Sequence, residues 1–296
     1  MSDSVTGKLV WYLAAVAGTF IMATLGVFVR HVSAGNEFVI ALGRFSIGVL
    51  CLAGLHALQN GDGNPKTIRV TWGLAGSGVF LALFVVCYFK AVLSGTLASA
   101  AFLLYLGPLI ASSLAAVWLG EGFDRRSGLL LAVALLGTLF ITEFRLPDDA
   151  DRLDGLVFGF LSGLFYGLFL LFNSSKIQGQ GTRSASTFYQ LLIASLVLVP
   201  VVAITGIDLT LSDLPWIAAV GVLHGFLALT LVITALGHLK TIEYSTISYG
   251  EPVMAALLGV GLYHESISFL QIVGCLCVLA AGITRVFVRE NAAPQV

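Results

Sequence analysis

Charged side chains are scarce in this chain of 296 residues. Only 10% of the residues are Asp, Glu, Lys or Arg, whereas 58% are hydrophobic. A soluble globular protein carries about 25% charged residues, and so few could not cover a water-exposed surface. The composition therefore excludes an ordinary soluble enzyme and a disordered chain, and it indicates a protein that lies in a membrane.

The chain also lacks an excess of basic residues, and it has little cysteine. Its formal net charge is −1 at pH 7, which leaves no surplus of Lys or Arg for a nucleic-acid backbone. All 4 cysteines lie in apolar segments. Cys275 and Cys277 are two residues apart and so point to different faces of a helix. We predict neither a disulfide framework nor a nucleic-acid partner.

Sequence motifs for cofactors are missing as well. No Walker sequence occurs, so the chain itself is not expected to be an ATPase. His264 and Glu265 are not followed by a second His at the spacing of a zinc-binding helix. We therefore expect no cofactor and no metal.

Long apolar segments fill the sequence instead. A helix needs about 20 mostly apolar residues to cross a bilayer, and ten segments fit. Because these runs are continuous rather than alternating, they predict helices and not barrel strands. We expect the first to be a retained helix, not a cleaved signal peptide. The segments are Lys8–Val29, Phe38–Leu58, Val70–Leu93, Thr96–Leu119, Ser127–Thr142, Gly155–Ser175, Ser186–Thr205, Leu214–Gly237, Tyr244–Tyr263 and Phe269–Val288.

The distribution of Lys and Arg predicts the orientation of these segments. The two termini and the even-numbered gaps together carry 10 of these residues, and the opposite side carries 4. Because basic residues are enriched on the cytoplasmic side, we expect both termini to be cytoplasmic. The acidic connection Pro147–Asp154 then faces outside.

The chain matches itself at a shift of 144 residues. This shift takes the third segment to the eighth and the fourth to the ninth, so each copy contains five helices. Because five is odd, the copies 1–145 and 146–296 should insert in opposite directions, which suits a transporter that opens to each face in turn. The matching pairs are Trp72 with Trp216, Ala91 with Ala235, Tyr105 with Tyr249, Pro108 with Pro252 and Glu121 with Glu265.

These residues resemble a known pattern. Pro108 and Pro252 lie within the fourth and ninth segments, Glu121 and Glu265 close them, and Arg44 lies in the second. The arrangement resembles the ten-helix EamA-type branch of the drug/metabolite transporter superfamily. The resemblance implies an all-α integral membrane protein of two inverted five-helix repeats in a bacterial inner membrane. It also implies a central cavity lined largely by helices 1, 3, 4, 6, 8 and 9, and, among members, the chain looks most like bacterial exporters of aromatic and other neutral amino acids.

The repeat-related tyrosines are the first cavity candidates. A mid-membrane Tyr needs a partner for its hydroxyl or access to water. Ser112 shares a helix face with Tyr105, and Ser245 does so with Tyr249. Each Pro leaves the carbonyl four residues earlier without its helical donor. The backbone carbonyls of Leu104 and Ser248 are therefore further candidates for polar contact with a substrate. Alternatively, the tyrosines only pack helices and the prolines only kink them.

Two ionisable side chains lie at mid-span. His224, which matches Phe80 at the shift of 144, could bind a substrate or bond a neighbouring helix. Glu251 could bind a substrate or a proton, or it could be a protonated group bonded between helices. It lies about 200° around an ideal helix from Tyr249, so both are not expected to face the cavity squarely. Tyr166 is a secondary cavity candidate.

Other polar residues are interpreted as structural. Arg44 could snorkel, pair with an acid or bind a carboxylate, and its position favours a structural role. Glu121 and Glu265 are expected to bond the start of the helix that follows each of them. The glycines spaced by four between Gly155 and Gly167 should let helices pack closely.

The resulting hypothesis is a secondary carrier for small neutral amino acids or related metabolites. A phosphate-bearing cargo would need two or more deep cations, and only Arg44 is clearly deep. A multidrug or organic-cation exporter of the same fold is the alternative, because one deep Glu could bind a cation. An intramembrane enzyme would need a catalytic set at membrane depth, and none is visible. The expected partners are the lipid bilayer and a small-molecule substrate, and the chain could be monomeric.

Overall fold

The computed structural model describes residues 2–29, 31–32, 36–58, 70–94, 97–122, 124–143, 153–178, 183–264 and 266–287. In these ranges the chain is helical, without strands. The helices are α1 (Ser2–Ala23), α2 (Leu25–Val29), α3 (Glu37–Leu58), α4 (Trp72–Ser94), α5 (Leu97–Leu104), α6 (Leu106–Trp118), α7 (Arg125–Ile141), α8 (Leu153–Phe172), α9 (Ser175–Gln178), α10 (Arg183–Thr205), α11 (Leu214–Val220), the π-helix η3 (Gly221–Ala228), α12 (Leu229–Leu236), α13 (Thr241–Ser248), α14 (Gly250–Tyr263) and α15 (Phe269–Phe287).

The predicted all-helical membrane architecture is confirmed. Within the described residues, 8 helical segments are long and apolar enough to cross a membrane, and Phe269–Thr284 is a shorter apolar helix. The predicted segment Tyr244–Tyr263 is not among them. A break at Tyr249 divides it into α13 and α14, as the break at Tyr105 divides the span Ala100–Trp118. The difference is polarity, because α13 (Thr241–Ser248) is rich in Thr and Ser and carries Glu243.

Both helix breaks lie three residues before a proline. Tyr105 separates α5 from α6 ahead of Pro108, and Tyr249 separates α13 from α14 ahead of Pro252. Proline has no N–H to donate to the carbonyl four residues earlier, and its ring crowds that carbonyl. The helical path is therefore interrupted at the two tyrosines that match in the sequence.

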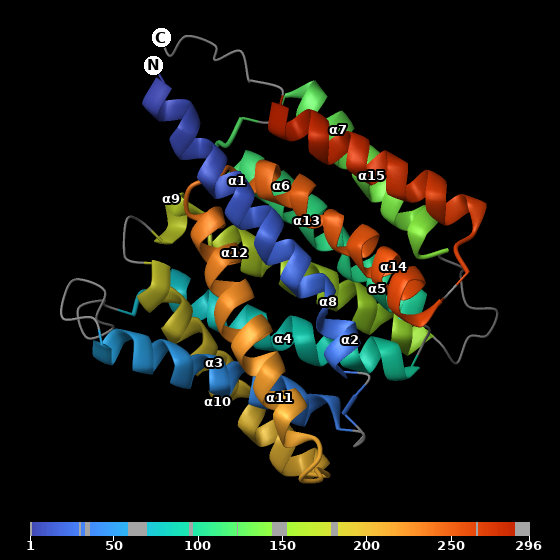
Figure 1. Ribbon diagram of the computed structural model, residues 1–296. Helices are drawn as coiled ribbons and strands as arrows, with labels where there is room; N and C mark the ends of the chain where they lie inside the picture. Colours follow the sequence, from blue (N-terminus) through green and yellow to red (C-terminus); the bar gives the residue numbers. More distant parts are fainter. Residues whose placement is uncertain are drawn as a thin grey trace.

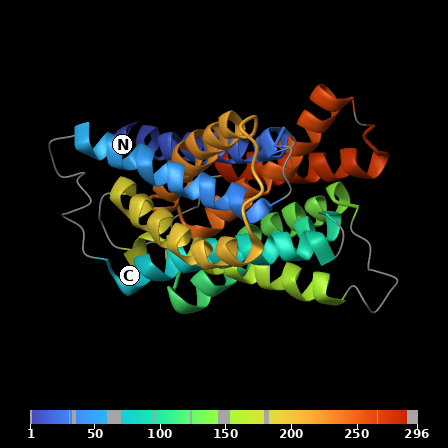
Figure 2. The ribbon, with the colours of Figure 1, turned by 90° about the horizontal axis from the view of Figure 1, so that it is seen from below.

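The helices form two layers (Figures 1 and 2). One layer contains α1, α3, α11, η3 and α12 to α15, and the other contains α4 to α8 and α10. Close contacts of α3 with α10 and of α7 with α15 join the layers along two edges. Among the described residues, α4 and α8 make no more than slight contact with α1, α13 and α14. Since α13 also packs on α6, contact between the layers is slight only where α4 and α8 face α1, α13 and α14, in the described ranges.

Glycine permits the closest helix approach within one layer. A Cβ atom on Gly225 of η3 would overlap the backbone carbonyl of Arg44 on α3. Gly48, one turn further along α3, faces the same Gly225 backbone. Small residues at such crossings let helix backbones pack directly, and this crossing fixes the backbone of Arg44 against η3.

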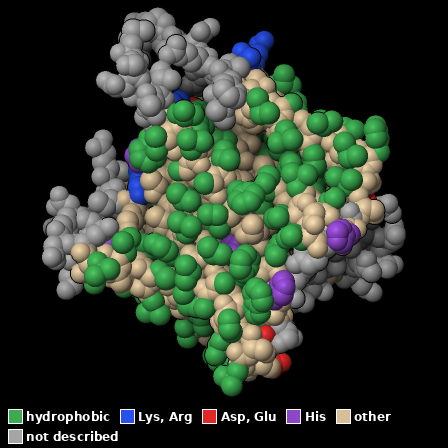
Figure 3. All heavy atoms as spheres, in the orientation of Figure 1, with side chains coloured by type: hydrophobic (Ala, Val, Ile, Leu, Met, Phe, Trp, Pro, Cys, Tyr) green, Lys and Arg blue, Asp and Glu red, His purple; other side chains and the backbone are tan. Residues whose placement is uncertain are grey.

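The outer surface is apolar. Leu58, Phe269 and Val117 are among many large hydrophobic side chains that are mostly exposed, and Figure 3 shows hydrophobic atoms over most of one face. In water such a surface would be unfavourable. It is the surface that a protein presents to lipid.

The connections are grouped as the Lys and Arg count predicts. On one side Glu121 contacts Thr241, and Lys176 donates to the Leu119 carbonyl. On the other side Asn36 donates to Thr205. The helices therefore alternate in direction as expected, and which side is cytoplasmic stays a prediction.

Candidate functional site

Polar and charged side chains gather around the two helix breaks at Tyr105 and Tyr249. The central polar cluster, as we call it, draws its members from α3, α4, α8, α13, α14 and the two helix breaks. Tyrosines dominate it, and it contains one cation and one anion. Its members are Arg44, Tyr88, Tyr105, Tyr166, Tyr244, Tyr249 and Glu251.

The two repeat-related tyrosines meet in this cluster. The Tyr249 hydroxyl donates a 2.8 Å hydrogen bond to the backbone carbonyl of Tyr105, and the ring centroids are 6.3 Å apart. Tyr249 is fully buried and Tyr105 nearly so. Tyr249 thus uses its hydroxyl within the protein, at the carbonyl that begins α6.

Glu251 lies close to Tyr105. Its carboxylate is within hydrogen-bonding reach of the Tyr105 hydroxyl. Tyr249 is fully buried, and the helical-wheel expectation that Tyr249 and Glu251 do not both face the cavity stays a prediction. Glu251 is half-buried. Tyr88, Tyr166 and Tyr244 also lie close enough to interact with its charge.

Arg44 points into the protein and does not snorkel. Its side chain is 9% exposed, and it interacts electrostatically with Glu251. One terminal nitrogen donates to the Met22 sulfur at 3.1 Å and to the His224 carbonyl at 3.4 Å. Its Nε atom has no hydrogen-bond partner in the part of the chain that the structure describes.

His224 lies beside the cluster in the π-helix. It is fully buried, and its Nε2 atom is 3.1 Å from the Thr24 hydroxyl. Because that hydroxyl donates to the Ile21 carbonyl at 2.7 Å, it is an acceptor for His224. π-Helical turns are rare and are frequent at functional sites. The repeat-related helix α4 is a regular α-helix at the matching positions, so this turn belongs to one half only.

Phe80 lies away from the cluster. Its ring packs against Phe165 at 6.1 Å and Phe172 at 5.0 Å, within the α4–α8 contact. Two of the predicted serines bond within their own helices, whereas the buried Ser245 hydroxyl has no hydrogen-bond partner among the described residues. Ser112 donates to the Pro108 carbonyl at 2.8 Å, and Ser248 donates to the Ser245 carbonyl at 2.9 Å. The structure therefore brings the tyrosines and Glu251 together and leaves Phe80 in helix packing.

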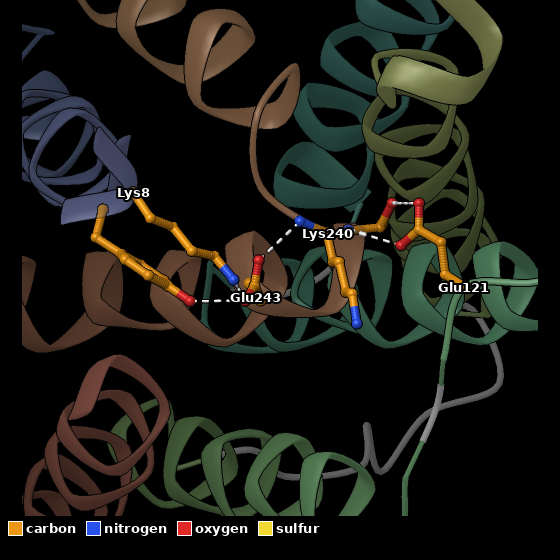
Figure 4. Close-up of polar contacts among 6 residues, drawn as sticks. Lys8, Glu121, Lys240 and Glu243 are labelled. Atoms are coloured by element: carbon orange, nitrogen blue, oxygen red, sulfur yellow. Dashed lines mark hydrogen bonds and ion pairs between the residues drawn. The ribbon is translucent and has the colours of Figure 1, made fainter. Parts of the chain in front are cut away.

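A second polar group closes one end of the molecule (Figure 4). Lys8 and Tyr12 of α1 each donate to the same oxygen of Glu243 at 2.7 Å. The Lys240 backbone N–H donates to the other oxygen at 2.9 Å. Glu243 is buried, whereas Lys8 is half-exposed. We name Lys8, Tyr12 and Glu243 the end lock, because they join α1 to the start of α13. Sequence reasoning missed it, although Glu243 was visible as an acid at a helix start.

Glu121 also binds the start of α13. It accepts hydrogen bonds from the Thr241 backbone N–H at 2.8 Å and from the Thr241 hydroxyl at 3.1 Å. The expected bond to the following helix is not its role, because Asp124 caps that helix by accepting from Ser127. Glu121 therefore joins the two layers at the same end as the end lock. Its repeat mate Glu265 lies outside the described residues.

Metal-binding side chains do not cluster in the described ranges. No group of three or more His, Cys, Asp or Glu side chains there could hold a metal ion. The four cysteines are free thiols. The chemistry that the central polar cluster offers is hydrogen bonding and charge, in a site shielded from water.

Comparison with known proteins gives a consistent picture. The model of the EamA-like transporter family matches twice, at residues 9–143 and 153–285. An uncharacterized transporter of Archaeoglobus fulgidus is 28% identical over 268 residues, which is 90% of this chain and 93% of that protein. A pseudopaline exporter, CntI, of Pseudomonas aeruginosa is 29% identical over 192 residues, which is 64% of each chain.

A solved crystal structure has a similar fold. It superposes with a TM-score of 0.82 and covers 94% of this chain and 98% of its own. The sequence identity is 16%, so this likeness concerns the fold alone.

Proposed function

Because the chain belongs to the EamA-like transporter family, we propose that it is a secondary transporter that exports small neutral amino acids or related metabolites. The protein is a membrane transporter with helices that cross the bilayer. The proposal adds the cargo, the export direction, the bacterial inner membrane and the alternating-access mechanism.

The central polar cluster is the observation that carries this proposal. It places one buried cation, one half-buried anion and several phenol groups between two layers in which α4 and α8 make no more than slight contact with α1, α13 and α14, among the described residues. Ionisable groups inside a membrane mark substrate or ion pathways. Opposite charges with aromatic surroundings suit a zwitterion that carries an apolar side chain.

The contact pattern supports ten helices in two inverted repeats, 1–145 and 146–296. The contact of α4 with α8 has a counterpart in that of α1 with α12, and the contact of α3 with η3 has one in that of α10 with α4. The two family matches divide the chain near the same point. Inverted repeats can exchange conformations, which moves access from one face to the other.

The end lock and Glu121 support a closed passage at one end. They tie the start of α13 to α1 and to the end of α6, at the side that the basic residues mark as cytoplasmic. At the other side, the described residues form polar contacts along the edges, such as Asn36 to Thr205 and Ser268 to Glu143. This state fits a carrier open to the outside.

An exporter of organic cations is the second candidate, and Glu251 favours it. Uptake by liposomes that contain the purified protein separates the two. We expect saturable uptake of labelled neutral amino acids, and uptake of methyl viologen without any amino-acid uptake would overturn the first proposal. Repeating the assay with and without a pH gradient tests proton coupling.

A further inference from the structure

Arg44 has unused hydrogen-bonding capacity in the middle of the protein. A guanidinium has five N–H donors. In the described residues Nε has no partner, and the contacts of the terminal nitrogen are a thioether at 3.1 Å and a distant carbonyl at 3.4 Å. A sulfur atom is a weak acceptor, and a buried charge normally has strong partners. Arg44 therefore has N–H donors that no anion among the described residues accepts.

Glu251 is the complementary group. It lies near enough to interact with Arg44, yet within the described residues no ion pair joins them. Opposite charges kept apart in a low-dielectric site lose the interaction that would offset their desolvation. Because Glu251 is only half-buried, a ligand with both charges could contact it as well as Arg44.

The pair is not a product of the internal duplication. At the shift of 144 residues, Arg44 corresponds to Phe188 and Glu251 corresponds to Gly107. Both charges lie in the layer of α1, α3 and α14, whereas Tyr88 and Tyr166 come from the opposite layer. The two charged side chains and the two tyrosine rings therefore belong to opposite layers.

We propose that Arg44 and Glu251 form a receptor for a zwitterion, in which Arg44 binds the α-carboxylate and Glu251 binds the α-ammonium of an amino acid. The apolar side chain of the ligand then lies toward Tyr88 and Tyr166. This inference rests on the proposed amino-acid cargo, and it gives Arg44 a binding role instead of the structural role expected from the sequence.

The experiment compares three ligands on the same protein. Phenylalanine carries both charges, phenylalaninamide lacks the carboxylate, and 3-phenylpropionate lacks the ammonium. Each competes with labelled phenylalanine for uptake into proteoliposomes. The unaltered protein should prefer phenylalanine to either analogue at least about tenfold, because each charged hydrogen bond contributes about 1.5–3 kcal/mol.

Substitutions assign each charge to its residue. Arg44→Gln should raise the inhibition constant of phenylalanine about tenfold or more and leave that of phenylalaninamide unchanged. Glu251→Gln should do the same while leaving that of 3-phenylpropionate unchanged. Arg44→Lys keeps the charge but not the planar fork. Its inhibition constant for phenylalanine should fall between that of the unaltered protein and that of Arg44→Gln. Lys90→Gln, at an exposed cation, is the matched control and should change nothing.

The possible failures are distinct. Uptake of phenylalanine with no preference over the analogues in the unaltered protein overturns the two-charge receptor, and this needs no variant to fold. Equal loss of affinity for all three ligands in Arg44→Gln overturns it as well. Absence of saturable amino-acid uptake in the unaltered protein overturns the proposed function, and the receptor with it.

Discussion

The hydroxyl of Tyr249 is 2.8 Å from the backbone carbonyl of Tyr105, its own counterpart 144 residues earlier in the chain. The bond joins the two helix breaks, one from each layer. It gives the Tyr105 carbonyl, at the start of α6, an additional partner from the other layer, in a place where water is scarce.

Tyr249→Phe should therefore lower stability. The change leaves the shape of the ring intact and removes the donor of one buried hydrogen bond, whose net contribution is about 0.5–1.5 kcal/mol. We expect a lower melting temperature of the detergent-solubilised protein. Tyr105→Phe is a comparison that keeps this bond, because the acceptor is a backbone carbonyl, and loses only the contact of its own hydroxyl with Glu251. An unchanged melting temperature for Tyr249→Phe would show that the hydrogen bond is not important.

The helix breaks also show how far the sequence alone can be taken. The shift of 144 residues identifies Tyr105 and Tyr249 as equivalent, and hydropathy locates the segments that contain them. A helical wheel cannot place Glu251 near Tyr105, because a wheel relates residues of one helix and these two belong to different helices. Nor can it predict the Lys8–Glu243 contact, which joins residues 235 positions apart and depends on how α1 crosses α13. Periodicity thus predicts elements, whereas contacts between layers require their packing.

Gly225→Ala tests the crossing of η3 and α3. The added methyl group would overlap the Arg44 backbone carbonyl, and overpacking a close helix contact typically costs about 1–3 kcal/mol, occasionally more. We expect a lower melting temperature and, because the Arg44 backbone moves, weaker substrate binding.

Gly54→Ala provides the comparison for Gly225→Ala. Gly54 lies on α3 with open space where its Cβ would be, so Ala should fit without loss. A similar fall in melting temperature for both variants would show that the close approach is not the cause.

Glu121 and Thr241 form a pair suited to a double-mutant cycle. Glu121→Ala removes both acceptors at the start of α13, and loss of such a cap costs about 0.5–2 kcal/mol. Thr241→Val removes only the 3.1 Å hydroxyl bond and keeps the 2.8 Å backbone bond, so its effect should be smaller. The double variant should be no less stable than Glu121→Ala alone. Additive losses in thermal unfolding would mean that the two side chains act independently.

The end lock should control access from one face. Glu243 accepts three hydrogen bonds from Lys8, Tyr12 and the Lys240 backbone, so Glu243→Ala should loosen α13 from α1. Lys8→Met should have a weaker effect, because Lys8 is 47% exposed and half-exposed ion pairs contribute at most about 1 kcal/mol.

A thiol at Ser245 reports this opening. Ser245 is fully buried below Glu243 on α13, so Ser245→Cys in a variant without native cysteines should resist a membrane-impermeant reagent. Adding Glu243→Ala should make the thiol react in inside-out vesicles, if this end is cytoplasmic, and not in right-side-out cells. At the shift of 144 residues, Lys8 corresponds to Arg152 and Glu243 corresponds to Ser99, so the other half has no carboxylate at the position of Glu243. Unchanged labelling of Ser245→Cys in both preparations would show that Glu243 does not hold this end closed, and labelling only in right-side-out cells would reverse the orientation.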